Sequence, residues 1–223
     1  MRKRQPAMSI PPTNEQRRRN IVKAATDLFL ARGYANTSLG DVQQTLTDAS
    51  LDVRRCFPTK TKLLIAVVAQ LADDYGRRRE RELESCRGDA LEKIQLLLAL
   101  DGPSVRGALL RSHGNGNVKL VVWLLTALAE RLTPILTRLI REGCEGGLFE
   151  TRCPAEVSAF LFAGLQFLTH RGLQPGEVHV VARRTRALPS IVESLLGAAP
   201  GSFNFLSGEP QRGSRREPGP QDG

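Results

Sequence analysis

The sequence predicts an all-α protein, and three observations lead to this prediction. Apolar residues make up 41% of the 223 residues and are mostly Leu, Ala and Val, whereas aromatic residues make up only 5%. That composition favours helices over sheets. Apolar residues also recur at helical spacing in several segments, with Gly and Pro between them, and no segment shows a competing apolar–polar alternation.

The first predicted helix begins at Glu15, after a flexible basic arm over residues 1–14, and ends before Gly33. Gly33 is a natural C-cap because glycine readily accepts positive φ. The apolar positions of this helix fall on one face, at the spacing of an amphipathic helix: Ile21, Ala24, Ala25, Leu28 and Phe29.

Two short helices are predicted next, over residues 39–46 and 51–56, with the polar residues 47–50 between them. Thr37 or Ser38 is the expected N-cap of the first. A long helix over residues 60–86 follows, with Thr59 as its expected N-cap after Pro58.

The rest of the chain predicts five more helices and a disordered tail. The tail, residues 200–223, is rich in Gly, Pro, Ser and Arg and poor in apolar side chains. The densest apolar runs are much shorter than the ~20 residues that span a bilayer, and the N-terminus has no apolar signal segment. The five helices are expected over residues 89–100, 104–111, 117–142, 154–171 and 176–196.

The positive charge is concentrated at the N-terminus. Residues 1–62 hold twelve basic and five acidic side chains, so they carry +7 of the formal net charge of +9. Such an asymmetry is typical of a phosphate-binding module joined to a neutral one, although a basic terminus that only aids solubility has the same charge.

The order of elements in the first 60 residues has the outline of a helix-turn-helix, in which the last helix enters the major groove of DNA. Arg54 and Arg55 lie on that helix, Lys60 opens the next, and residues 50–52 begin the recognition helix, where base readout is usually concentrated. The candidate DNA-binding residues are Thr37, Ser38, Ser50, Leu51, Asp52, Arg54, Arg55 and Lys60.

This N-terminal segment resembles the DNA-binding domain of the TetR/AcrR family of transcriptional regulators. The similarity covers about residues 17–71 without gaps, which is about a quarter of the chain. It rests on the segment IVKAATDLF at 21–29, Gly33-Tyr34, Thr37-Ser38-Leu39, Val42, Phe57 and KTKLL at 60–64. The resemblance implies a three-helix domain over residues 15–62 and a helical ligand-binding and dimerisation domain over residues 63–199.

The turn departs from the family pattern. Thr47 stands where the family usually has a glycine, Asp48 where it has a buried valine, and Arg54 where it has a phosphate-binding tyrosine. An arginine makes the phosphate contact more strongly, but a turn with positive φ costs a non-glycine residue about 1 kcal/mol. Either the turn is repacked, with Ala49 in place of the valine, or the domain binds DNA in an unusual way.

The family resemblance also implies a small-molecule effector and a homodimer. Helix 117–142 is apolar over a broad face, with Pro134 inside it, and helix 154–171 is apolar nearly all round. The helices over 154–171 and 176–196 are therefore expected to pair with a second subunit. The candidate lining of the effector pocket is Trp123, Leu124, Ala127, Phe160 and Phe167.

Other chemistries are less well supported. His113, His170 and His179 are scattered, and the four cysteines have no metal-ligand spacing, although Cys144 and Cys153 flank one loop. We therefore expect no enzyme, metal, cofactor or membrane partner, but a cytoplasmic regulator, specifically a repressor, that binds double-stranded DNA as a dimer. The alternative is a ligand-sensing or protein-interaction module whose degenerate helix-turn-helix no longer reads DNA.

Overall fold

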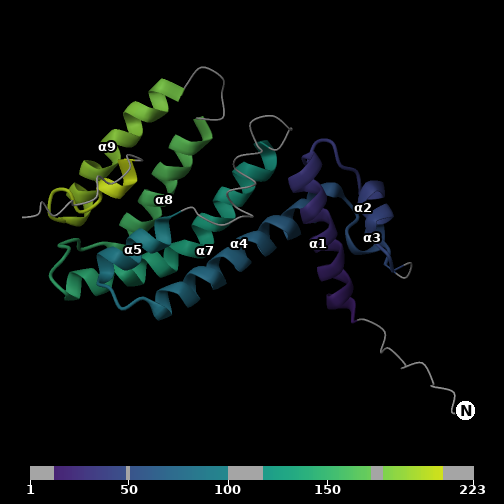
Figure 1. The fold of residues 1–223 in the computed structure, drawn as a ribbon, viewed down its shortest axis with the longest axis horizontal. Helices are drawn as coiled ribbons and strands as arrows, with labels where there is room; N and C mark the ends of the chain where they lie inside the picture. The colour runs from purple at the N-terminus through teal and green to yellow at the C-terminus, as the bar shows by residue number, and fades with distance from the viewer. Residues whose placement is uncertain (1–12, 49–50, 100–117, 172–177, 208–223) are drawn as a thin grey trace, which may run out of the picture. The chain divides into compact units, whose positions relative to one another are not determined.

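The computed structural model describes residues 13–48, 51–99, 118–171 and 178–207, without the side chains of residues 118 and 165–185 (Figure 1). These residues form helices and no strand, which confirms the predicted all-α class. The predicted helix over residues 104–111 lies outside the described residues, as do nearly all of the predicted arm and residues 208–223. The helices are α1 (Asn14–Arg32), α2 (Leu39–Thr45), α3 (Val53–Cys56), α4 (Lys60–Ser85), α5 (Ala90–Leu98), α7 (Val118–Glu145), α8 (Pro154–Arg171), α9 (Val178–Leu196) and the 3-10 helix η1 (Asn204–Ser207).

Local capping rules account for several helix ends. Gly33 follows α1 with φ of 92°, in the region that favours glycine. Ser38 caps the N-terminus of α2, and the Thr59 hydroxyl accepts a hydrogen bond of 3.2 Å from the Lys62 N–H at the start of α4. Gly33 and Thr59 were predicted as caps and Ser38 was one of two candidates beside Thr37, because a cap depends on residues within one turn of the helix end.

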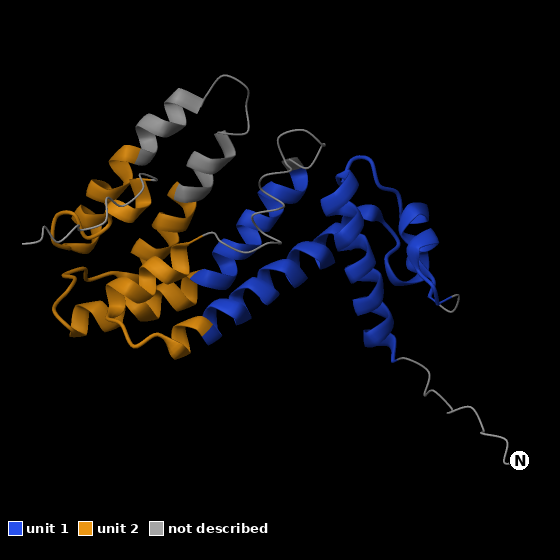
Figure 2. Cartoon of the chain, viewed as in Figure 1, with its two compact units in different colours: residues 1–81, 100–132 blue, residues 82–99, 133–223 orange. Residues whose placement is uncertain are grey.

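The chain divides into two compact units (Figure 2). The first consists of residues 1–81 and 100–132, so the start of α7 clusters with α1, α2, α3 and most of α4. This division by packing falls later in α4 than the domain boundary predicted between residues 62 and 63. The core of the first unit includes Ile21, Ala25, Phe29, Val42, Leu51, Val53, Phe57, Leu63, Leu64, Val67, Leu120, Leu124 and Leu128.

The second unit consists of residues 82–99 and 133–223 and contains α5, the rest of α7, α8, α9 and η1. Its core is again apolar, so each unit has the buried surface that stabilises a helical domain. The buried side chains are Leu83, Ala90, Ile94, Leu97, Ile135, Leu136, Leu139, Ile140, Phe149, Val157, Leu161, Val192, Leu196 and Phe203.

The prediction that the chain is disordered from residue 200 is wrong for residues 200–207. Phe203 is fully buried, its ring centroid lies 6.1 Å from that of Phe149, and its N–H donates a hydrogen bond of 3.0 Å to the Glu193 carboxylate. Phe205 packs on it at 5.6 Å. Composition averaged over 24 residues hid this short apolar cluster, because the surrounding residues are polar.

Helix α7 contains one segment, Lys119–Glu145, that is long and apolar enough to cross a membrane by length and composition alone, and the mean hydropathy of its most apolar window is 1.5. This segment is longer than the apolar runs noted in the sequence, because it includes charged residues and those runs end at them. Half of its most apolar window is buried inside the protein, which is typical of a core helix.

The substitution Phe203→Ala tests the ordered tail. It should lower the free energy of unfolding by about 3–5 kcal/mol, because it leaves a cavity where an aromatic ring was fully buried. Chemical denaturation measures the loss. Asn204→Ala is the control, since Asn204 is exposed and should change stability little; equal losses in both variants would mean that Phe203 is not packed.

Candidate nucleic-acid interface

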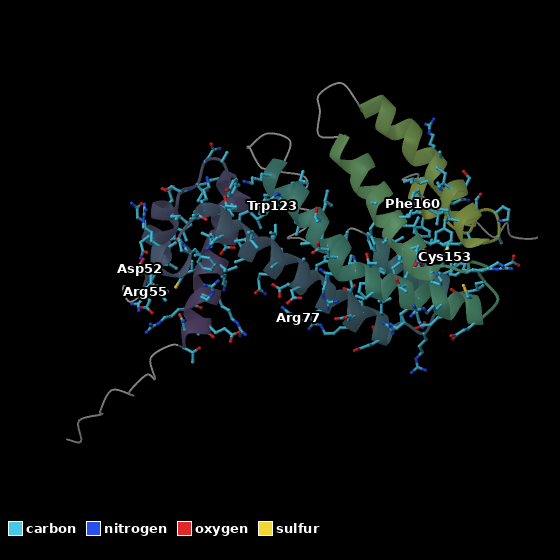
Figure 3. The ribbon with its side chains drawn as sticks, turned by 180° about the vertical axis from the view of Figure 1, so that it is seen from behind. Asp52, Arg55, Arg77, Trp123, Cys153 and Phe160 are labelled. Carbon is cyan, nitrogen blue, oxygen red and sulfur yellow. The ribbon has the colours of Figure 1, made fainter. Side chains whose placement is uncertain are left out.

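The residues of greatest interest lie on α3, which exposes Arg54 and Arg55. Figure 3 shows Arg55 and Asp52 at the outer edge of the N-terminal helices. Helix α3 has only four residues, so its own hydrogen bonds cannot stabilise it. Its position must therefore come from contacts with the rest of the unit.

The start of α3 is held by a side chain from α2. The Gln43 amide Nε2 donates a hydrogen bond of 2.7 Å to the Leu51 carbonyl, and its Oε1 accepts one of 2.9 Å from the Val53 N–H. The Asp52 carboxylate also accepts from the Arg55 N–H at 3.1 Å, as an N-cap. The backbone groups left unpaired where a helix begins therefore have partners here.

The end of α3 is held by a side chain from α1. The Arg18 guanidinium donates a hydrogen bond of 2.9 Å to the Cys56 carbonyl and lies 4.4 Å from the centroid of the Phe57 ring. Phe57 itself is buried. Both ends of the helix that carries Arg54 and Arg55 are thus fixed by longer, neighbouring helices.

At Thr47 the turn between α2 and α3 needs no glycine. Thr47 does not have positive φ, and neither does any other non-glycine residue in the described part of the chain. The Asp48 carbonyl accepts a hydrogen bond of 3.1 Å from the Leu51 N–H, which closes the turn. The cost expected for Thr47 in a left-handed conformation is therefore absent. Ala49 lies outside the described residues.

The start of α2 has a reciprocal capping box. The Ser38 hydroxyl accepts a hydrogen bond of 3.1 Å from the Asp41 N–H, and the Asp41 carboxylate accepts from the Ser38 hydroxyl at 2.7 Å and from its N–H at 2.6 Å. These hydrogen bonds from Ser38, the hydroxyl first, hold the pKa of Asp41 below its ordinary value of 3.8. They stabilise the carboxylate and fix the first turn of α2.

Lys60 fastens α4 to the loop before α2. Its Nζ donates a hydrogen bond of 3.2 Å to the Ala35 carbonyl and lies 4.3 Å from the centroid of the Tyr34 ring. Partial burial lowers the pKa of Lys60, and the nearby Asp41 carboxylate opposes that shift. Part of its hydrogen-bonding capacity is therefore already used within the protein.

The structure divides the predicted DNA-binding residues into several groups. Ser38, Asp52, Arg54 and Arg55 are exposed, and Lys60 is half-buried. Thr37 and Leu51 are buried, with the Thr37 hydroxyl donating to the Gly33 carbonyl at 2.9 Å. Because these two side chains lie in the core, we do not keep the prediction that they contact DNA. Ser50 lies outside the described residues.

Sequence reasoning missed the two side chains that hold α3. Gln43 acts on backbone groups eight and ten residues away, and Arg18 on one 38 residues away. Neither contact produces a periodic pattern.

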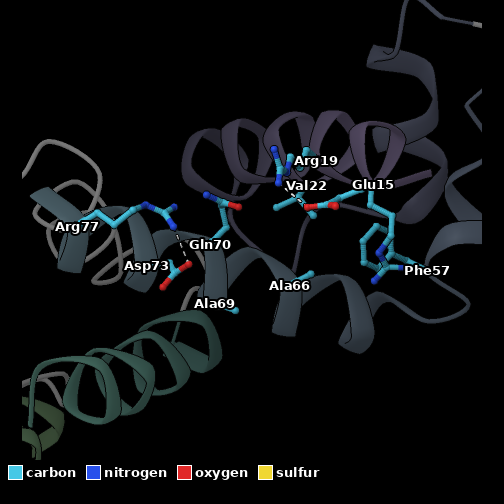
Figure 4. A pocket seen from close by; sticks show the side chains of 10 residues that line it. Glu15, Arg19, Val22, Phe57, Ala66, Ala69, Gln70, Asp73 and Arg77 are labelled. Carbon is cyan, nitrogen blue, oxygen red and sulfur yellow. Dashed lines mark hydrogen bonds and ion pairs between the residues drawn. The ribbon is translucent and has the colours of Figure 1, made fainter. Parts of the chain in front are cut away.

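The first unit also contains a groove of about 800 Å³ between α1 and α4, shown in Figure 4. Its walls carry charges of both signs, including an ion pair of 2.9 Å between Arg77 and Asp73. The carboxylates of Asp74 and Asp73 raise the pKa of the Arg77 guanidinium. Besides these two residues, the groove is lined by Glu15, Arg18, Arg19, Val22, Phe57, Ala66, Ala69 and Gln70.

A smaller cavity of about 400 Å³ lies between α4 and α7 in the same unit, and its lining includes Trp123 and Ala127, two of the residues predicted for an effector pocket. Leu124 is instead fully buried in the core. Phe160 lies on α8 in the other unit and is 60% exposed, and the side chain of Phe167 lies outside the described residues. Of the five predicted pocket residues, the described lining of this cavity contains two, Trp123 and Ala127.

Arg131 on α7 binds two carboxylates of α4 and so links the two helices that line this cavity. Its guanidinium makes two hydrogen bonds to Glu80, of 2.7 and 3.2 Å, and an ion pair of 3.4 Å with Asp73. These carboxylates raise the pKa of Arg131, with the Glu80 hydrogen bond as the main cause. A Cβ added at Gly76 would lie 2.8 Å from the Arg131 side chain, so the close approach depends on glycine.

The described residues contain no cluster of His, Cys, Asp and Glu that could hold a metal ion. The side chains of His113, His170 and His179 lie outside the described residues. All four cysteines are free thiols, and Cys144 and Cys153 both contact Thr151.

The substitution Gln43→Ala tests the bridge between α2 and α3. Removal of the amide leaves the Val53 N–H and the Leu51 carbonyl without their partner, so the free energy of unfolding should fall by about 1–3 kcal/mol. Denaturant titration gives the value. The matched control is Gln44→Ala, because Gln44 is the exposed neighbour on the same helix. A loss no larger than that of the control would refute the bridge.

The capping box predicts a pH dependence of stability. Because folding lowers the pKa of Asp41, its contribution is fully present above the ordinary value of 3.8 and is lost as the pH falls through the folded value. The stability difference between the wild type and Asp41→Asn should therefore shrink on acidification. Thermal melts at several pH values measure it. Ser38→Ala, which removes the hydroxyl donor, should weaken this pH dependence, and an unchanged profile would count against the box.

No family model matches the chain, and no curated protein matches it either. Solved structures do match. The ligand complex of RolR with resorcinol has a TM-score of 0.61 at 18% identity, over 88% of this chain and 95% of that one. A TetR-family transcriptional regulator from Pectobacterium atrosepticum has a TM-score of 0.59 at 21% identity, over 83% of this chain and 98% of that one. The chain therefore has the fold of the TetR-family transcriptional regulators.

Proposed function

We propose that this protein is a ligand-responsive, DNA-binding transcriptional regulator of the cytoplasm, and specifically a repressor. The observation that carries the proposal is the pair of exposed arginines, Arg54 and Arg55, on a short helix fixed at both ends. Exposed cationic side chains on a helix whose backbone is fixed are what a recognition helix needs, because they can reach phosphates and base edges.

The DNA-binding domain in this proposal is the segment of residues 15–62. Arg54 and Arg55 bind phosphates or guanine edges through their guanidinium groups. Ser38 at the start of α2 and Asp52 at the start of α3 are further exposed contacts in this proposal, and Ser50, outside the described residues, is a contact proposed from the sequence alone. Lys60 adds positive charge behind the recognition helix while it holds the loop before α2.

In this proposal the protein is a homodimer whose subunits pair through α8 and α9. The dimer, not the single chain, binds DNA. Two apolar side chains support this surface: Phe160 on α8 is 60% exposed and Ile191 on α9 is 47% exposed. Large exposed apolar side chains on packed helices are typical of subunit interfaces. Two-fold symmetry then sets the recognition helices about one DNA turn, ~34 Å, apart, on an inverted repeat.

The effector is a small molecule that binds in the helical domain of residues 63–199. The cavity lined by Trp123 and Ala127 supports this assignment, and the similar protein RolR was solved with the ligand resorcinol. The similar protein from Pectobacterium atrosepticum is a transcriptional regulator, which supports a regulator that catalyses no reaction. The alternative is a module that does not bind DNA, and the next experiment distinguishes it from the proposed regulator.

Salt dependence of binding tests the role of the two arginines. Arg54→Ala and Arg55→Ala should each weaken binding to labelled duplex DNA, and the removal of one phosphate interaction should lower the slope of log affinity against log salt by about one. Fluorescence anisotropy gives the slope. Arg152→Ala, an exposed arginine in the other unit, is the matched control and should leave the slope unchanged. Slopes that stay at the wild-type value in both α3 variants would contradict the proposal.

A further inference from the structure

The cavity between α4 and α7 has a distinctive chemistry. Its volume of about 400 Å³ lies in the range of small-molecule sites. Most of its lining is aliphatic, with Ile65, Val68 and Ala69 from α4. Among the described residues of the lining, Trp123 is the one aromatic side chain and Glu130 the one charged side chain, and both come from α7.

The ring of Trp123 already has a cation beside it. The Lys119 ammonium lies 5.1 Å from the ring centroid, within the distance at which a cation is attracted to an indole face. Figure 3 shows Trp123 on α7. The electron-rich ring is therefore accessible to a positive charge in this structure.

Glu130 is placed to complement such a charge. It follows Trp123 by seven residues, two helical turns, so both side chains lie on the same side of α7. Within the described ranges Glu130 has no ion-pair partner, in contrast to Glu80 on α4, which pairs with Arg131. An exposed carboxylate at the edge of an apolar cavity, with no ion pair to another described residue, favours a cation and disfavours an anion.

We propose that this cavity binds a small apolar organic cation, with the cationic group between the Trp123 ring and the Glu130 carboxylate and the apolar part against Ile65 and Val68. The inference rests on the proposed effector response and adds the chemical class of the ligand. The Glu130 carboxylate repels an anionic ligand, and it offers a neutral one at most a hydrogen bond.

Lys119 competes with this ligand. Its ammonium contacts the Trp123 ring and would lie close to a bound cation, so the two positive charges repel each other. Lys119 also lies 5.9 Å from the centroid of the Tyr34 ring in the loop before α2. Two charged residues of α7 thus have opposite expected effects on ligand binding: Glu130 strengthens it, and Lys119 weakens it.

The chain has one tryptophan, Trp123, so intrinsic fluorescence of the full-length protein reports directly on this cavity. The probes are para-hydroxyphenyl trimethylammonium and its uncharged isostere para-tert-butylphenol. We expect the cation to change the fluorescence saturably and to bind more tightly than the isostere. Glu130→Gln should weaken cation binding about threefold or more, and Lys119→Gln should strengthen it about threefold, while neither changes the binding of the isostere much.

The control variant is Glu156→Gln, an exposed glutamate on α8 in the other unit, which should bind the cation like the wild type. Equal binding of the two probes, or the same change in Glu130→Gln and Glu156→Gln, would overturn the proposal. Calorimetric titration of the same variants guards against a binding event that leaves the fluorescence unchanged. Duplex binding is measured separately by anisotropy. If the wild-type protein binds DNA but does not bind the cation, only the proposed ligand class is refuted.

Discussion

The amide of Gln43 is the contact on which the candidate DNA-binding surface depends. A four-residue helix cannot hold its own position, and the segment from Leu51 to Val53 would leave backbone groups unpaired beside the core. One side chain supplies both the donor and the acceptor that these groups need. With Arg18 at the other end of α3, it fixes the direction in which Arg54 and Arg55 leave the surface.

Tyr34 connects this surface to the rest of the first unit. Its ring packs edge-on against Phe29 with centroids 5.2 Å apart, and the ammonium groups of Lys60 and Lys119 lie 4.3 and 5.9 Å from it. Lys119 also contacts Trp123 in the cavity wall. The loop before α2 and the cavity therefore share one lysine, so a ligand that displaces Lys119 changes a contact of that loop.

Much of the fold could be predicted from the sequence, because helix periodicity and capping are local. The ends of α1, α2 and α4 follow from Gly33, Ser38 and Thr59 alone. The candidate site was predicted only in part, since exposure depends on tertiary packing: Leu51 begins the recognition segment but faces the core. The partners of Gln43 and Arg18 are distant in sequence, so no local pattern indicates these contacts. The eight residues 200–207 are ordered because one phenylalanine, Phe203, is fully buried.

Selection from a random pool of DNA duplexes, with the purified full-length protein at about physiological salt, tests the central claim most directly. A dimer that presents two fixed recognition helices should enrich an inverted repeat whose half-sites are centred about one helical turn apart. A pool that shows no enriched sequence, and binds only at low salt, would contradict the account, because the N-terminal positive charge would then attract DNA without reading it.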